Sequence, residues 1–169
     1  MNTWRIEKLH KQDRKVFDCG TAVLNEYLAK RAGREQRKRF CTCFLAISNE
    51  TDRIDGFYTL SSSSIALTDL SPSVQKKLPR YQDVPAARIG RLAVDRQAQG
   101  KRLGGALIGD ALNRVLNADI GCYAVVVDAK DDKAISFYLH MGFESLQDKP
   151  DVLYLPIATA KDAFPPETQ

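Results

Sequence analysis

The sequence predicts one α/β domain built around a mixed sheet flanked by helices. Its 169 residues, 44% hydrophobic and 27% charged, are enough for one globular domain of about 100–200 residues. Strand and helix patterns follow one another in the order βα(ββ)αβαβαββ, which is typical of a sheet with helices packed on it. No internal repeat or linker interrupts this order. We expect residues 1–160 to form the domain and residues 161–169 to form a tail.

The N-terminal part of the chain predicts a strand followed by a helix. Residues 3–9 alternate loosely and predict a strand. Residues 18–21 begin a helix, with Thr21 as a candidate cap, and its apolar stripe ends at Ala32. Beyond Ala32 the helix either continues with a cationic end or breaks near Gly33.

A hairpin and a short helix follow. Residues 40–48 and 53–62 predict two strands joined by a turn rich in Asn and Asp. The pair Ser71-Pro72 opens a helix through Leu78, because proline suits the first helical turn. We expect residues 79–85 to form a loop.

The C-terminal half of the chain predicts a long amphipathic helix. Leu103, Leu107, Ala111 and Val115 recur at four-residue intervals and form one apolar stripe. Gly142 is suited to ending the next helix. The expected strands and helices occupy residues 87–94, 103–116, 122–127, 133–141, 143–146 and 152–157.

Several classes of protein are excluded at this stage. No run of about 18 apolar residues is present, and residues 1–8 lack an apolar signal core, so we expect no membrane segment and no secretion. Four cysteines are too few for a disulfide scaffold, which favours a cytoplasmic protein. Cysteine and histidine lack metal-ligand spacing, so we expect no metal. His10 and His140 have no nucleophile motif beside them, which leaves a hydrolase triad unsupported.

The charge of the chain is clustered. The formal net charge is +4, but residues 30–39 carry six basic side chains against Glu35 alone. Residues 76–91 carry five against Asp83, whereas the segment from residue 144 onward is acidic. Such clustering suits a protein that binds phosphates. It is equally compatible with a solvated helix surface.

The loop at residues 95–106 is a candidate anion site. It joins a strand to the long helix, it is rich in glycine, and it carries Arg96, Lys101 and Arg102. Small residues let a ligand approach the backbone, and the first N–H groups of a helix are unpaired. The loop is neither a Walker A motif nor a dinucleotide fingerprint. A packing role for its glycines is the alternative.

Five ordered segments resemble a known family. The strand Leu92-Ala-Val94, the loop Gln99-Gly-Lys-Arg-Leu-Gly104, the long helix, Val125-Val-Val-Asp-Ala129 and Ala134-x-x-Phe-Tyr-x-x-x-Gly-Phe143 resemble the GNAT acetyltransferases. The family loop reads Gln/Arg-x-x-Gly-x-Gly/Ala. Arg102 stands where that pattern has glycine, so it either changes the loop geometry or supplies a cation to a phosphate.

Three further segments resemble one subgroup, the GNAT-type toxins of bacterial type II toxin–antitoxin systems. They are Phe17-Asp-Cys-Gly-x-x-x-Leu-Asn-x-Tyr-Leu28, Leu78-Pro-Arg-Tyr81 and Ile89-Gly-Arg-Leu-Ala-Val-Asp95. The similarity covers roughly residues 3–157.

The resemblance implies a GNAT fold and an acetyl-CoA site in a V-shaped gap between the strands that end at Val94 and near Val127. Tyr138 would protonate the departing thiolate, although by itself this side chain fits a packed aromatic equally well. The coenzyme contacts implied are Leu92, Ala93, Val94, Gln99, Gly100, Lys101, Arg102, Leu103, Gly104, Gly105 and Phe137.

The toxin subgroup acetylates the α-amine of aminoacyl-tRNA and thereby blocks translation. The resemblance therefore implies an aminoacyl-tRNA substrate, a ribbon-helix-helix antitoxin as partner, a homodimer, and contact with DNA only through the antitoxin. The basic clusters suit a tRNA acceptor arm. The candidate tRNA contacts are Arg34, Arg37, Lys38, Arg39, Lys77, Arg80 and Arg91.

Two alternatives remain at this stage. A GNAT enzyme acting on a small amine, such as an aminoglycoside or polyamine, or on a protein N-terminus would share the loop and Tyr138. Cationic substrates favour acidic sites, which disagrees with the basic clusters. A non-enzymatic binding module on the same scaffold is the second, favoured only by Arg102.

Overall fold

The computed structural model describes residues 3–163 and has the predicted order of elements, with one more helix at its end. Its strands are β1 Trp4–Lys8, β2 Thr42–Ser48, β3 Ile54–Ala66, β4 Asp83–Val94, β5 Ala124–Asp128, β6 Glu144–Leu146 and β7 Lys149–Pro156. Its α-helices are α1 Ala22–Glu26, α2 Ala32–Arg37, α3 Pro72–Gln75, α4 Leu103–Leu116, α5 Asp132–His140 and α6 Ile157–Ala163. The shorter turns are the π-helical η1 Tyr27–Arg31 and the 3₁₀ turns η2 Leu67–Asp69 and η3 Arg96–Ala98. The rest of the expected tail, residues 164–169, lies outside the described residues.

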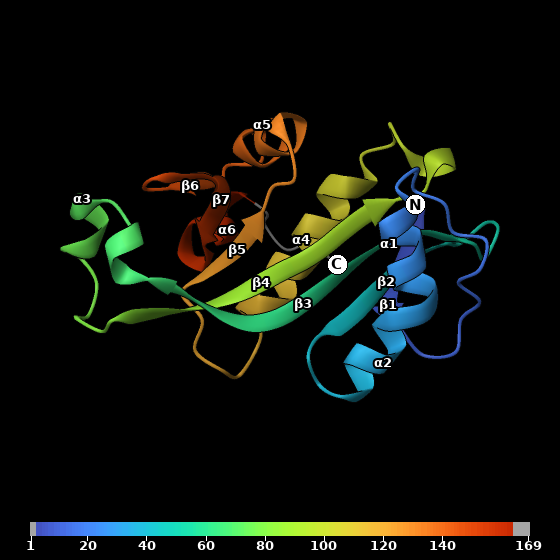
Figure 1. The fold of residues 1–169 in the computed structure, drawn as a ribbon, viewed down its shortest axis with the longest axis horizontal. Helices are drawn as coiled ribbons and strands as arrows, with labels where there is room; N and C mark the ends of the chain where they lie inside the picture. The colour runs from blue at the N-terminus through green and yellow to red at the C-terminus, as the bar shows by residue number, and fades with distance from the viewer. Residues whose placement is uncertain (1–2, 164–169) are drawn as a thin grey trace. The chain divides into compact units, whose positions relative to one another are not determined.

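The strands form the predicted mixed sheet, with the order β1-β2-β3-β4-β5-β7-β6 (Figure 1). Strand β4 pairs with β5 in parallel, whereas β1–β2, β2–β3, β5–β7 and β6–β7 are antiparallel pairs. Two compact units divide the chain. The first contains the residues up to Ser61 together with Gly90–Ala111, and the second contains Ser62–Ile89 and the residues from Leu112.

In the first unit the sheet is covered by helices on both faces. On one face, Phe17 and Tyr27 pack on Phe57, with ring centroids 5.5 and 6.2 Å away. On the other face, α4 lies so close that a Cβ at Gly56 would meet Leu103 and Leu107 within 3.2 Å. Both layers are visible in Figure 1, where α1 and α2 lie in front of the strands and α4 behind them.

The helical segment continues past Gly33, which settles the question left open by the sequence. Thr21 occupies the N-cap position of α1, but its side chain makes no capping hydrogen bond. The π-helical turn η1 shifts the register before α2, and Arg14 donates a hydrogen bond of 3.0 Å to the carbonyl of Leu28 within it. The cationic end of the segment is therefore helical as far as Arg37.

The second unit has its own core. Ile65, Val84, Val126 and Tyr154 are buried together in it. Helix α5 ends at His140, and Gly142, with a φ of 98°, follows its cap residue. Several expected boundaries in the chain are wrong. Strand β3 continues to Ala66 rather than residue 62, and β7 begins at Lys149 rather than residue 152. Strand β4 begins at Asp83 within the expected loop 79–85, because Pro85 uses its carbonyl to accept a hydrogen bond from Tyr123 and needs no N–H there.

Two further boundaries that differ are those of β2 and α3. Strand β2 begins at Thr42 rather than residue 40, because Arg39 and Phe40 close the end of α2 through backbone hydrogen bonds. Helix α3 has the expected Ser71 cap and Pro72 but ends at Gln75 rather than Leu78. Among the described residues no helix is long and apolar enough to cross a membrane, and no group of three metal-ligating side chains occurs.

The close approach of α4 to Gly56 makes a testable prediction. In Gly56→Ala, the new Cβ would meet the carbonyl of Ala93 and two leucine side chains at 3.1–3.2 Å, and the backbone carbonyl has little freedom to move. We expect the free energy of unfolding to fall by about 1–3 kcal/mol. Urea denaturation measures this. Gly121→Ala, which meets nothing within 4 Å, is the matched control and should not destabilise.

Candidate functional site

The loop between β4 and α4 is held by a buried carboxylate. Asp95 follows the last residue of β4 and is only 2% exposed. One of its oxygens accepts the N–H of Gln97 at 2.9 Å, which caps the 3₁₀ turn η3. The other accepts the N–H of Asp18 at 2.9 Å, from a segment 77 residues earlier. Asp95 thus joins the start of this loop to the loop that precedes α1.

Three more contacts join these two loops. The backbone N–H of Arg96 donates to the carbonyl of Asp18 at 2.9 Å, and the Arg96 guanidinium lies 3.6 Å from the Asp18 carboxylate. Gln99 donates from its side chain to the carbonyls of Cys19 at 3.3 Å and Val94 at 3.1 Å. Hydrogen bonds from Gly20 and Asn25, with the Arg96 charge, lower the pKa of Asp18. The loop is therefore fixed at its base.

The outer part of the same loop is open and cationic. Lys101 and Arg102 are exposed, and a Cβ at Gly100 would meet nothing within 4 Å. The carbonyl of Arg102 accepts the N–H of Ala106, so Leu103, Gly104 and Gly105 are the first residues of α4. Their N–H groups precede the first intrahelical partners and are available to an anion. This arrangement fits a pyrophosphate.

Arg102 adopts the conformation that explains the family's glycine. Its φ is 66°, in the left-handed region that favours glycine. The loop therefore keeps its geometry with an arginine, at a conformational cost of about 1 kcal/mol. A glycine at this position would adopt the same conformation without strain.

Only some of the predicted acetyl-CoA contacts near the end of β4 have exposed side chains. Ala93 is 6% exposed and Leu103 is 1% exposed, so the side chains of both belong to the core. Any contact they make with a ligand is through the backbone. Leu92 and Val94 are partly exposed and, being two residues apart, share the other face of the strand.

Tyr138 is a buried aromatic of the second unit. It lies on α5, whose N-terminus is capped by Asp131 through a 2.8 Å hydrogen bond to Ala134. Its ring contacts Phe137 and Phe143, with centroids 5.2 and 5.4 Å away. Burial, and secondarily the negative charge of Asp128, raises the pKa of Tyr138 to about 12. The group is therefore a neutral hydrogen-bond donor at pH 7.

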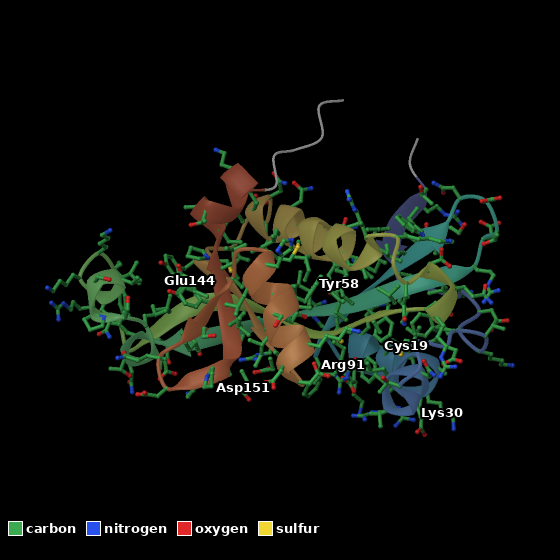
Figure 2. All side chains as sticks on the ribbon, turned by 90° about the horizontal axis from the view of Figure 1, so that it is seen from above. Cys19, Lys30, Tyr58, Arg91, Glu144 and Asp151 are labelled. Atoms are coloured by element: carbon green, nitrogen blue, oxygen red, sulfur yellow. The ribbon has the colours of Figure 1, made fainter. Side chains whose placement is uncertain are left out.

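The candidate tRNA contacts fall into two sets. Arg34, Arg37, Lys38 and Arg39 are exposed at the end of the helical segment of the first unit, and Lys77 and Arg80 are exposed in the second unit. Arg91 differs, because its guanidinium stacks 3.8 Å from the centre of the Tyr27 ring. Figure 2 shows Arg91 on the face of the strands that α1, η1 and α2 cover. It shows Lys30 on the side of that helical segment that faces away from the strands.

Comparison with known proteins decides the family. A GNAT acetyltransferase domain family matches residues 78–152. The tRNA-acetylating toxin of Mycobacterium tuberculosis (strain ATCC 25618 / H37Rv) is 38% identical over 130 residues, which are 76% of each chain. This chain belongs to the GNAT-type acetyltransferase toxins.

Solved structures agree with this membership. A tyrosine-to-phenylalanine variant of KacT is 32% identical, with a TM-score of 0.89 over 96% of this toxin and 100% of that chain. AtaT complexed with acetyl-methionyl-tRNAfMet is also 32% identical, with a TM-score of 0.87 over 95% of this toxin and 99% of that chain. The predicted GNAT fold is thereby confirmed, and this toxin is an acetyl-CoA-dependent N-acetyltransferase.

Sequence reasoning missed Asp18 and Asp95 as residues that position the loop. Asp95 carried a usable signal, since an Asp directly after a strand often caps the next turn. The pairing with Asp18 had none, because 77 residues separate the two.

Asp95→Asn tests this role. Asparagine has one acceptor oxygen, so one of the two N–H groups loses its partner and faces an amide NH₂. We expect the unfolding free energy to fall by about 1–3 kcal/mol. We also expect the KM for acetyl-CoA to rise more than kcat falls, because the loop loses its anchor. A loss of kcat alone would contradict this, and Asp148→Asn, on an exposed turn, is the control.

Proposed function

We propose that this toxin transfers the acetyl group of acetyl-CoA to the α-amine of an aminoacyl-tRNA, and so blocks translation where charged tRNA is used, in the cytoplasm. The observation that carries the proposal is the 38% identity with a tRNA-acetylating toxin over 76% of both chains. It is supported by the exposed cationic end of α2, which suits a polyanionic substrate.

The loop after β4 binds the pyrophosphate in this proposal. The N–H groups of Leu103, Gly104 and Gly105 point along the helix axis toward the anion, and Lys101 and Arg102 add charge. Gln99 holds the loop against the carbonyl of Val94. The backbone of Leu92, Ala93 and Val94 supplies donors to the pantetheine and to the thioester oxygen. Fixed donors of this kind are effective because charge develops on that oxygen during the reaction.

Acetyl-CoA supplies a thioester: its carbonyl carbon bonds to the amine nitrogen, the carbon–sulfur bond breaks, and the electron pair stays on sulfur. Tyr138 donates a hydrogen bond to that sulfur. The proton lost by the amine nitrogen ends on the sulfur. With a pKa raised to about 12, the hydroxyl remains protonated throughout the neutral range. Among the described residues no protein group accepts a hydrogen bond from it, so the proton is available to a ligand.

The amine needs little help to react. A free α-amine has a pKa of about 7.7–8.0, so a substantial fraction is already neutral near pH 7. This toxin therefore needs no strong general base, in agreement with the absence of an acidic side chain from residues 92–94.

The partners follow the relatives. AtaT has been solved with acetyl-CoA and the C-terminus of its antitoxin AtaR, and KacTA as a complex with DNA. We extend this to a ribbon-helix-helix antitoxin that neutralises the present toxin, to DNA contact through that antitoxin, and to a homodimer. A basic surface is a suitable target for an acidic antitoxin tail.

A transfer assay tests the function. Labelled acetyl-CoA is incubated with total charged tRNA, uncharged tRNA and a panel of polyamines and aminoglycosides. We expect label on charged tRNA alone, and we expect Tyr138→Phe to lower kcat by about 10²–10⁴-fold with little change in KM. Label on the small amines but not on tRNA would instead make this an ordinary small-molecule GNAT enzyme. Tyr81→Phe, an exposed tyrosine, is the matched control.

Arg102→Gly tests the cation of the loop. Glycine relieves the left-handed conformation, so we expect the unfolding free energy to hold or to rise by up to about 1 kcal/mol. The loss of a charge from the pyrophosphate should raise the KM for acetyl-CoA several-fold, and Arg102→Lys should restore it in part. An unchanged KM in the glycine variant would remove Arg102 from the binding site.

A further inference from the structure

The end of α2 is a corner built from backbone hydrogen bonds. The N–H of Arg39 donates to the carbonyl of Gln36 at 3.0 Å, and the N–H of Phe40 donates to the carbonyl of Glu35 at 2.9 Å. This pair of bonds is the Schellman motif, which places its C′ residue in the left-handed region. Here that residue is Arg39, with a φ of 64°. Glycine is the residue that adopts this conformation without strain.

The residue after Arg39 also departs from the usual motif. A hydrophobic residue at C″ ordinarily packs back on the helix. Phe40 occupies that place but is 73% exposed. The corner therefore carries two unfavourable features side by side, a strained arginine and an aromatic ring in water, and neither is required by the fold.

The corner is rigid in spite of this. The side chain of Gln36 donates to the carbonyl of Leu9 at 2.9 Å and accepts the N–H of Cys43 at 2.9 Å. It thereby fixes the helix end to the loop after β1 and to the start of β2. Arg39 and Phe40 are thus presented to solvent on a preorganised support.

The helix end that precedes Phe40 is rich in exposed cations. Arg34, Arg37 and Lys38 are exposed on the same helix end. The acid of this segment, Glu35, is engaged by the hydroxyl of Tyr27 at 3.2 Å and by the guanidinium of Arg31 at 3.4 Å. Its charge is therefore balanced within the protein, and a ligand at this helix end meets exposed cations and an exposed ring.

We propose that Arg39 and Phe40 form a nucleotide-binding corner, in which an unpaired base of the substrate tRNA stacks on Phe40 while Arg39 binds the adjoining phosphate. Single-stranded nucleotides are commonly bound in this way, by aromatic stacking beside basic side chains. A protein partner would use the apolar ring but would gain nothing from the exposed cations of the same helix end unless it were acidic. The inference rests on the proposed function, because it names the place where that tRNA is held.

The ring and the charge make different contributions, which separate experimentally. Phe40→Ala should raise the KM for charged tRNA about 5- to 150-fold, the range expected for the loss of one stacked base. The slope of log KM against log salt should not change, because no phosphate contact is lost. Phe40→Trp should restore the KM, and the KM for acetyl-CoA should be unaffected. Ile120→Ala, which removes an equally exposed apolar side chain elsewhere, is the control.

Arg39→Gly gives the complementary result. It should raise the KM for charged tRNA and reduce the salt slope by about one phosphate contact. It should also raise the unfolding temperature by about 2–4 °C, because the strain is relieved. Arg39→Lys should keep both the salt slope and the unfolding temperature of the unmodified protein. A variant that is both more stable and a poorer tRNA enzyme is not expected from a merely structural arginine.

The outcomes are distinguishable from a failure of the proposed function. If the unmodified protein acetylates charged tRNA and Phe40→Ala does so with unchanged KM, the nucleotide-binding corner is wrong and the function stands. If Phe40→Ala changes neutralisation by the antitoxin or the oligomeric state but not the KM, the corner is a protein contact and the inference is overturned. If charged tRNA is not acetylated at all, the proposed function itself fails.

Discussion

The buried carboxylate of Asp95 is the contact on which the anion-binding loop depends. A carboxylate that is 2% exposed is stable only with hydrogen-bond partners, and here both partners are backbone N–H groups, of Asp18 and Gln97. The carboxylate therefore fixes backbone rather than side chains. Two segments far apart in sequence take their positions from it, and the 3₁₀ turn η3 follows it directly. The exposed, glycine-rich part of the loop can stay open because its base is fixed.

Tyr138 is held by packing rather than by hydrogen bonds. No hydrogen bond of the described residues fixes its hydroxyl; Phe137 and Phe143 fix its ring instead. Burial raises the pKa of the hydroxyl, which keeps the proton in place and makes the group a donor rather than a reservoir of protons. A donor suits the stabilisation of a departing thiolate, whose own pKa of about 8.5 makes it a weaker base than tyrosinate. Full proton transfer from Tyr138 to sulfur is uphill, so the hydrogen bond itself is the more important contribution.

The sequence predicts the order of elements and the long helix well, because periodicity reports which face of each element is buried. It predicts boundaries less well where backbone groups decide them. Pro85 fits within β4 because its carbonyl accepts a hydrogen bond from Tyr123 and no N–H is needed there. Phe40 is not part of β2 because its N–H donates to the carbonyl of Glu35 at the end of α2. Composition and position predict the anion-binding loop, whereas the individual coenzyme contacts and the role of Tyr138 come from resemblance to a family. The Asp18–Asp95 contact was not predicted, because no local pattern links residues 77 positions apart. The stacking of Arg91 on Tyr27 was equally hidden.

Arg39 and Arg102 show why an unfavourable backbone conformation is informative. Both have φ near 65°, both end or begin a helix, and both stand where glycine would be more stable. In each case the residue present is a long cation exposed to solvent, not the Asn or Asp that tolerates this region better. Conformational strain of this kind persists when the surroundings over-determine it, and it is concentrated at functional sites. A positive charge at the base of a polyanion site is a sufficient reason for it. The two arginines therefore point to the same physical requirement, one at the proposed coenzyme loop and one at the proposed tRNA surface: phosphate must be met by a cation on a fixed helix end.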